Sequence, residues 1–110
     1  MNILYIVSCA SQQISFAASI NLKANVESDM HSTVFPYYDG KIISVNPFTE
    51  FTGFTLGFDW NQTNIGSKIS SNGESFDAWA NGQLDYYLLI DGFIKLYSQS
   101  VSISGTVSVF

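Results

Sequence analysis

The sequence has few charged side chains, and this shortage excludes several classes of protein. Only 12% of its 110 residues are charged, none is arginine, and the four cations are all lysines. The formal net charge of −5 argues against nucleic-acid binding, because phosphates need a basic surface. It also argues against electrostatic attachment to anionic membranes. Serine, threonine, asparagine and glutamine supply most of the polarity, a composition more typical of extracellular β proteins than of cytosolic enzymes.

Cysteine and histidine occur once each, which leaves little material for a reactive site. Cys9 has no partner for an internal disulfide, and His31 is the single histidine available as a base or metal ligand. Asp59, Asn61 and Asn64 could offer oxygens to calcium, but without paired carboxylates they indicate a polar turn instead. No carboxylate pair has a spacing that singles it out for hydrolysis. We therefore predict a protein that is not an enzyme, with no catalytic residue, no metal and no cofactor.

Long apolar runs are also missing, so no segment approaches the ~20 residues of a membrane-spanning helix.

The first residues of the sequence match two kinds of processing signal. Ser15-Phe16-Ala17 before Ala18 has the small-x-small pattern of a signal-peptidase site, although no basic residue precedes it. Ile6-Val7-Ser8-Cys9 also matches a lipoprotein processing box, and a buried or discarded thiol is the simpler interpretation. We predict a truncated signal peptide at residues 1–17, one domain at 18–110, and a secreted or cell-surface location.

What the sequence does contain is a set of strand and turn signals. Hydrophobic residues make up 46% and aromatic residues 15% of the chain, enough for a packed core. Asn-Gly and Asp-Gly pairs favour the type I′ turns that join antiparallel strands. Four such pairs lie between apolar or alternating segments: Asp39-Gly40, Asn72-Gly73, Asn81-Gly82 and Asp91-Gly92. The alternating residues on both sides of the last pair predict a hairpin over residues 83–98.

The middle of the chain fits both a helix and a strand. Phe48, Phe51, Phe54 and Phe58 recur at helical steps, whereas Phe54, Leu56, Phe58 and Trp60 alternate as in a strand. The threonines and glycines among them are poor helix formers, so we favour strand. The predicted strands cover residues 14–27, 32–38, 41–46, 53–60, 65–70, 74–80, 83–90, 93–98 and 100–110. Many short strands without a helix predict an all-β fold, an antiparallel β-sandwich.

Two tryptophans next to polar side chains raise the prospect of sugar binding. Aromatic rings stack on the apolar faces of sugars, while amides and carboxylates bind the hydroxyl groups. Trp60, Asn61 and Trp79 are the residues that we select for such a site. The alternative is that both tryptophans fill the core of the sandwich. A secreted carbohydrate-binding β-sandwich module is thus the second functional hypothesis.

The segment from Ala18 to Glu27 alternates without a break and carries the main hypothesis. It resembles the start of bacterial fimbrial (pilus) subunits of the chaperone–usher class, above all the coli-surface-antigen type, and the closing Ser104-Gly105-Thr106-Val107-Ser108-Val109-Phe110 is similar to their last strand. The resemblance implies an immunoglobulin-like sandwich that lacks one strand and receives the N-terminal strand of the next subunit. The residues donated would be Ile20, Leu22, Ala24 and Val26, and the acceptor groove would be lined by Val101, Ile103, Val107 and Val109.

The same resemblance implies partners and a location. The subunits would self-associate into an extracellular filament, with a periplasmic chaperone during assembly and a host glycan as the target of adhesion. The alternative is that the alternating strand pairs within its own domain, as most internal strands do. A long, lightly charged strand at the end of a chain favours assembly, because soluble monomers usually blunt such edges.

Overall fold

The protein folds into six long β-strands arranged as two sheets. The computed structural model describes residues 2–15, 17–34, 37–53 and 57–110, and the side chains of these except 30–34, 37–39 and 88–90. The N-terminal sheet has the order β1-β2-β3 and the C-terminal sheet β4-β5-β6, with every neighbouring pair antiparallel. The strands are β1 (Asn2–Ser15), β2 (Ala18–Val34), β3 (Tyr37–Gly53), β4 (Phe58–Ile69), β5 (Ser75–Ile90) and β6 (Phe93–Ser108). The prediction of an all-β, antiparallel fold compatible with a β-sandwich is confirmed.

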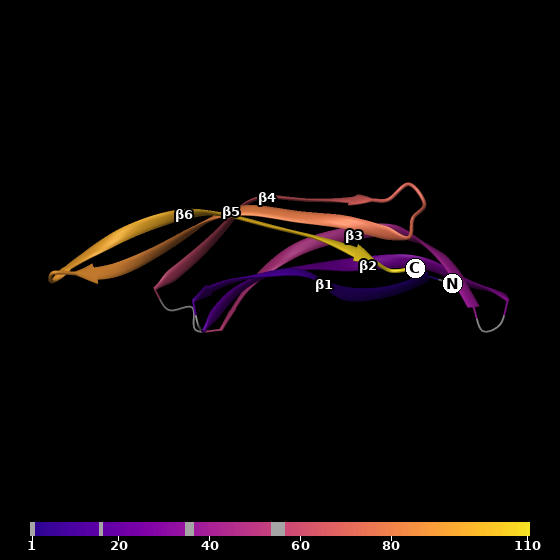
Figure 1. Ribbon diagram of the computed structural model, residues 1–110, viewed down its shortest axis with the longest axis horizontal. Coiled ribbons are helices and arrows are strands. Elements are labelled where there is room, and N and C mark those ends of the chain that lie inside the picture. Colours follow the sequence, from indigo (N-terminus) through magenta and orange to yellow (C-terminus); the bar gives the residue numbers. More distant parts are fainter. Residues whose placement is uncertain (1, 16, 35–36, 54–56) are drawn as a thin grey trace.

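The two sheets lie face to face in an elongated molecule of 68 × 22 × 16 Å (Figure 1). Within each sheet every strand pairs with its neighbour in sequence, so each sheet is an up-and-down meander. An immunoglobulin sandwich joins its strands by Greek-key connections instead. The immunoglobulin-like detail that the family resemblance implies is therefore not confirmed. The part of the chain that the structure describes contains no helix long and apolar enough to span a membrane.

The core lies between the sheets and follows directly from residue alternation. Successive side chains of a strand point to opposite faces, so every second residue of β2 and β5 faces the other sheet. Phe76 and Leu84 of β5 are 1% exposed and meet the fully buried side chains of β2. The buried core consists of Ile20, Leu22, Ala24, Val26, Ile42, Phe76, Ala78, Ala80, Leu84, Val101 and Ile103.

The edge strand β1 contains a β-bulge, and its apolar side chains face the core on both sides of the bulge. A register shift between Ser8 and Ala10 inserts Cys9 as an extra residue, so the inward positions change from odd to even numbers. The shift keeps one face apolar on both sides of the bulge, as β-bulges do. At the other end of the strand, the Tyr5 hydroxyl lies 2.7 Å from Ser28 Oγ, a fully buried group of β2. The structure thus places most of the predicted leader, residues 2–15, in a strand paired with β2.

Two of the four turn predictions are confirmed and two are wrong. Asn72-Gly73 and Asp91-Gly92 lie in turns, and Asp91, Gly92 and Gly73 have positive φ. Asp39-Gly40 lies within β3 and Asn81-Gly82 within β5. The nine predicted strands become six because four of the predicted breaks are absent, so that neighbouring predictions join in β3, β4, β5 and β6, while β1, whose residues were predicted as a leader, adds one strand. Phe54 and Leu56, two members of the alternating series in the middle of the chain, lie outside the described residues.

Candidate functional site

The residues selected for strand donation lie in the middle of the N-terminal sheet. Ile20, Leu22, Ala24 and Val26 are all 0% exposed and face the C-terminal sheet. Their strand, β2, is paired with β1 on one side and with β3 on the other. This arrangement matches the alternative in which the strand pairs within its own domain. Donation of β2 to another subunit concerns a second chain and stays a prediction, but it would first require β2 to leave both neighbours.

The residues selected for the acceptor groove share the inner side of the last strand. Val101 and Ile103 of β6 are 7% and 6% exposed, and Val107 and Val109 pack against the same core. β6 is an edge strand, since its one sheet neighbour is β5. The four valine and isoleucine side chains thus pack against the same core. Val101, Ile103 and Val107 belong to β6, and Val109 follows its last residue. That they receive a donated strand stays a prediction.

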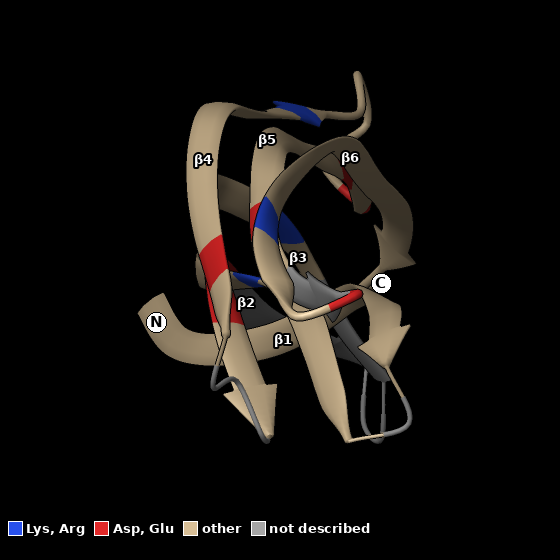
Figure 2. Ribbon diagram, turned by 90° about the vertical axis from the view of Figure 1, so that its left-hand side faces the viewer, with Lys and Arg blue, Asp and Glu red and all other residues tan. Residues whose placement is uncertain are grey.

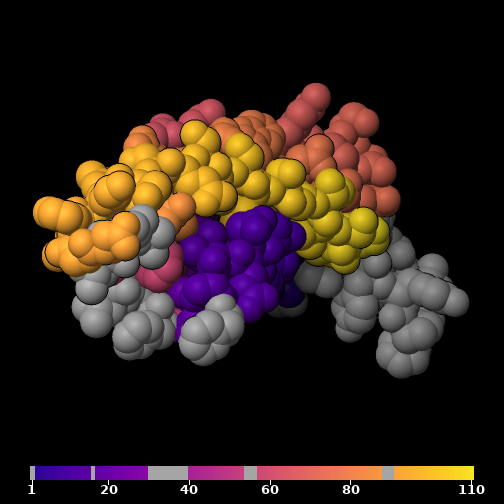
Figure 3. Space-filling model, turned by 60° about the vertical axis from the view of Figure 1, so that its left-hand side comes forward, coloured from indigo at the N-terminus to yellow at the C-terminus, as the bar shows by residue number. Residues whose placement is uncertain are grey.

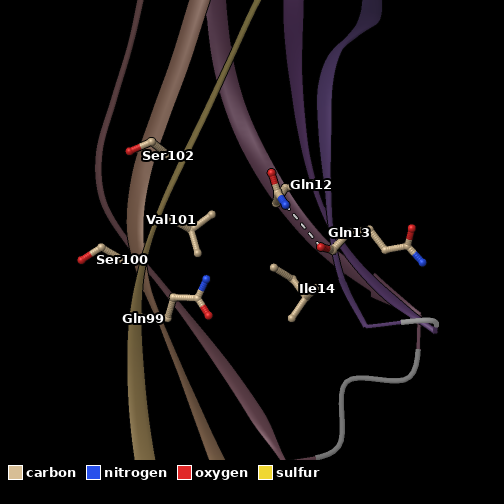
Figure 4. Close-up of a pocket in the computed structure, with 7 residues that line it drawn as sticks. All are labelled: Gln12, Gln13, Ile14, Gln99, Ser100, Val101 and Ser102. Carbon is tan, nitrogen blue, oxygen red and sulfur yellow. Dashed lines mark hydrogen bonds between the residues drawn. The ribbon is translucent and has the colours of Figure 1, made fainter.

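A pocket opens where the two edge strands β1 and β6 diverge, and we call it the seam. The strands run side by side in Figure 3, with the backbone of Cys9 against Gly105. Further along they separate and enclose a space of about 280 Å³. The side chains of Gln12, Ile14, Gln99 and Val101 point into this gap, whereas the Ser100 and Ser102 hydroxyls point away from it (Figure 4). The seam is therefore an open cleft lined by two amides and two aliphatic groups.

A second feature is a two-stranded projection, residues 87–96, which we call the arm. β4 begins at Phe58, which pairs with Tyr86, and the Tyr87 N–H donates to the Gly57 carbonyl at 3.2 Å. Beyond Tyr87 the described C-terminal sheet has only β5 and β6. The arm reaches past the rest of the sandwich at one end of the molecule (Figure 1). Among its described side chains, four large apolar ones are exposed: Phe93 by 71%, Ile94 by 74%, and Tyr87 and Leu96 by 58%. A two-stranded ribbon with exposed apolar faces is marginally stable in water by itself.

The base of the arm is held by a row of aromatic rings. Tyr86 stacks on Tyr97 with ring centroids 5.6 Å apart, and Phe58 lies 6.0 Å from Tyr86. Phe51 of β3 meets Phe58 edge to face at 6.2 Å, which links the arm's base to the N-terminal sheet. Such ring pairs add about 0.5–1.5 kcal/mol each beyond area burial. The arm therefore leaves the sandwich from a fixed position. Our sequence analysis found this hairpin but not its projection, although the unbroken apolar run from Tyr86 to Ile90 was a signal.

The two tryptophans selected for sugar binding lie on opposite faces of the C-terminal sheet. Trp60 pairs with the buried Leu84, packs on the core and donates a hydrogen bond from Nε1 to Thr49 Oγ1 at 3.1 Å. Trp79 and Asn61 lie on the outer face. The predicted trio is therefore split, and the core alternative is correct for Trp60. Trp79 and Asn61 remain available to solvent.

The charged side chains of the described residues are distributed over the molecule. Figure 2 shows acidic and basic positions scattered over both sheets. Within the described residues, no three histidine, cysteine, aspartate or glutamate side chains lie close enough to hold a metal ion. Burial raises the pKa of the Cys9 thiol, which makes it a poorer nucleophile at neutral pH. The side chain of His31, the one candidate base, lies outside the described residues.

Comparison with known proteins adds no identification. Searches of protein-family models, of curated proteins and of solved structures found no significant match to this chain.

Proposed function

We propose that the protein is a structural subunit of an extracellular filament, in which the arm of one copy enters the seam of the next. The observation that carries this proposal is the arm itself, a fixed two-stranded projection with four strongly exposed apolar side chains. The composition, poor in charge and rich in hydroxyl and amide groups, supports a place outside the cell. The family resemblance of the first segment points to the same class of protein.

The chemistry of the two surfaces is complementary. Ile14 and Val101 offer apolar contact to the arm, while the free edge of β6 offers backbone groups to an added strand. Gln12 and Gln99 can bond to backbone groups that the added strand leaves unpaired. Two different surfaces form the contact, so each subunit can bind one neighbour through its arm and another through its seam, which is the head-to-tail arrangement that a filament needs.

Magnitudes show why strand pairing is needed as well as apolar contact. Full burial of the four exposed side chains of the arm would contribute roughly 6–12 kcal/mol. Association costs about 4–15 kcal/mol in lost translational and rotational freedom. Side-chain burial therefore only offsets that cost, and the backbone hydrogen bonds of an added strand supply the surplus. We expect the complete contact to be lost when either surface is changed.

Sedimentation velocity on the purified chain and three double variants tests the proposal. Ile94→Asp with Leu96→Asp places two charges on the arm. Gln12→Glu with Gln99→Glu places two charges in the seam at constant side-chain size. We expect the unaltered chain to form oligomers that grow with concentration, and both of these variants to be monomers, because burying an unpaired carboxylate is costly. A control, Asn64→Asp with Ser104→Asp, adds the same charge elsewhere and should assemble normally.

Mixing the two monomeric variants gives the sharpest result. The arm variant retains an intact seam and the seam variant an intact arm, so an equimolar mixture should form a one-to-one dimer that cannot extend. A mixture that remains monomeric would contradict the arm-and-seam contact and leave a symmetric contact as the alternative. An unaltered chain that is monomeric at every concentration would refute self-association altogether.

A further inference from the structure

The outer face of the C-terminal sheet is a polar surface with one large ring in it. On β6 this face presents a row of hydroxyl groups. On β5 its residues alternate along the strand with the residues buried in the core. The residues of this surface, which we call the outer face, are Asp59, Asn61, Asn64, Gly66, Lys68, Asp77, Trp79, Asn81, Gln83, Asp85, Ser98, Ser100, Ser102, Ser104 and Thr106. None of them belongs to the arm, and Ser100 and Ser102, which also border the seam, point their hydroxyls away from it.

Trp79 lies between two small neighbours. Across β4 it pairs with Gly66, and across β6 it pairs with Ser104. Its indole leans over Gly66, where a β-carbon would lie 2.5 Å from Cζ2 and 2.9 Å from Nε1. The glycine therefore leaves the ring room to lie against the sheet, with its other side turned toward solvent. The side chain is half-buried, and the core contacts of β5 with the N-terminal sheet lie on the opposite face.

Polar side chains next to the ring are held by hydrogen bonds between strands. The Thr106 hydroxyl donates to Asp77 at 2.6 Å, and the Ser102 hydroxyl donates to Asn81 at 2.8 Å. Asp85 accepts from Ser98 at 2.6 Å and from Gln83 at 3.2 Å. Asp77 Oδ1 and Asn81 Oδ1 each accept from one of these hydroxyls and can take a further donor, because such oxygens bind more than one hydrogen. Asp85 is more fully used, since Oδ1 has these two donors and Oδ2 accepts from Asn61 at 3.3 Å. The groups beside Trp79 are thus oriented before any ligand arrives.

The charge of the outer face restricts the ligand. Asp59, Asp77 and Asp85 outnumber Lys68, and the remaining polar groups are uncharged. Anionic ligands are repelled by such a surface, whereas a neutral molecule with many hydroxyl groups finds acceptors and donors on both sides of the ring. Oriented hydrogen-bonding groups around an aromatic platform suit a sugar, since one face of a pyranose ring is apolar and its rim is polar.

We infer that the outer face binds a neutral glycan, with one sugar ring stacked on Trp79. Asp77 and Asn81 flank the tryptophan along β5 and accept hydrogen bonds from the sugar hydroxyls. Neighbouring sugars along the chain extend over the small residues of β6, where serine side chains leave the surface flat. This binding site is independent of the proposed filament contact, and either can fail without the other.

An array of immobilised oligosaccharides tests the inference. It presents neutral chains of glucose, mannose, galactose, xylose and N-acetylhexosamine, together with sialylated and sulfated chains. We expect the purified protein to bind at least one neutral class and no anionic class. Trp79→Ala should weaken that binding by about fivefold to tenfold, which corresponds to ~1–1.4 kcal/mol of ring stacking. Trp60→Phe, a change in the other tryptophan, should retain it.

The melting temperature of each variant is measured as well, so that loss of glycan binding can be distinguished from unfolding. A second variant, Asn81→Ala, keeps the ring and removes one polar partner, and should weaken binding less than Trp79→Ala. Failure to bind any neutral chain, binding to anionic chains alone, or equal binding by Trp79→Ala and the unaltered protein would each overturn the inference.

Discussion

Three glycines of this sandwich lie in strands and leave space for a neighbouring aromatic ring. Gly82 lies beneath the ring of Trp60, Gly66 beneath Trp79, and Gly40 against the ring of Phe110. In each case a β-carbon would meet ring atoms at less than van der Waals distance. A glycine in a strand that admits a close neighbour is a recognised pattern, yet it cannot be told from a turn glycine by its sequence alone. This is why two Asx-Gly pairs misled the prediction.

At residue scale, Leu22 and Lys23 separate the two interpretations of the N-terminal segment. Leu22 is fully buried in a central strand, so Leu22→Asp should destabilise the isolated domain by at least about 3 kcal/mol, enough to unfold many small domains. The Lys23 side chain is 34% exposed and pairs with Glu50 at 2.9 Å on the outside of the sheet. Lys23→Asp should therefore cost only about 1 kcal/mol. Urea unfolding followed by circular dichroism measures both.

The outcome distinguishes an internal strand from a donated one. A donated strand would leave the domain's own fold nearly unchanged in both variants, with only assembly lost in Leu22→Asp. Two nearly equal unfolding curves would thus contradict the strand order of the structure, and a large loss in Leu22→Asp alone would support it.

At the scale of elements, β1 can be tested through one hydrogen bond. Tyr5→Phe leaves the buried Ser28 hydroxyl without its 2.7 Å partner, which should lower the free energy of unfolding by about 1–3 kcal/mol. Ser28→Ala alone removes the other half of the pair, and the double variant should cost less than the sum of the two. A double-mutant cycle from urea unfolding gives the coupling. A cycle with no coupling would contradict the packing of β1 on β2.

The strands were largely predictable from the sequence, whereas their lengths and their partners were not. Alternation identified β2, β5 and β6, because one face of each is buried and the other is polar. Periodicity says which face of a strand is apolar but not what covers it, so the same pattern in Ile20 to Val26 fitted both donation and internal pairing. The outer-face position of Trp79 and the inner position of Trp60 depend on register, which a bulge at Thr63 shifts. No local sequence signal fixes that register.

At the scale of the whole molecule, net charge makes a prediction about assembly. Every copy carries a formal charge of −5, so copies repel one another, while the proposed arm contact is apolar. Added salt screens the repulsion and leaves apolar contact intact. We expect oligomers to increase from low to physiological ionic strength, as measured by sedimentation velocity. A decrease would mean that ion pairs hold the subunits together, contrary to the contact proposed.

The simple strand order also has a consequence for synthesis. The first sheet is complete when residue 53 has been made, yet its covering partners Phe76, Leu84 and Val101 come later in the chain. Domains form from the N-terminus as the ribosome elongates the chain, at roughly 5–20 residues per second. For several seconds a finished three-stranded sheet therefore displays Ile20, Leu22 and Val26 to water. A nascent chain with only the N-terminal sheet formed displays the kind of apolar surface that holdase chaperones bind. Slower translation after residue 53 would prolong the time in which this surface can aggregate.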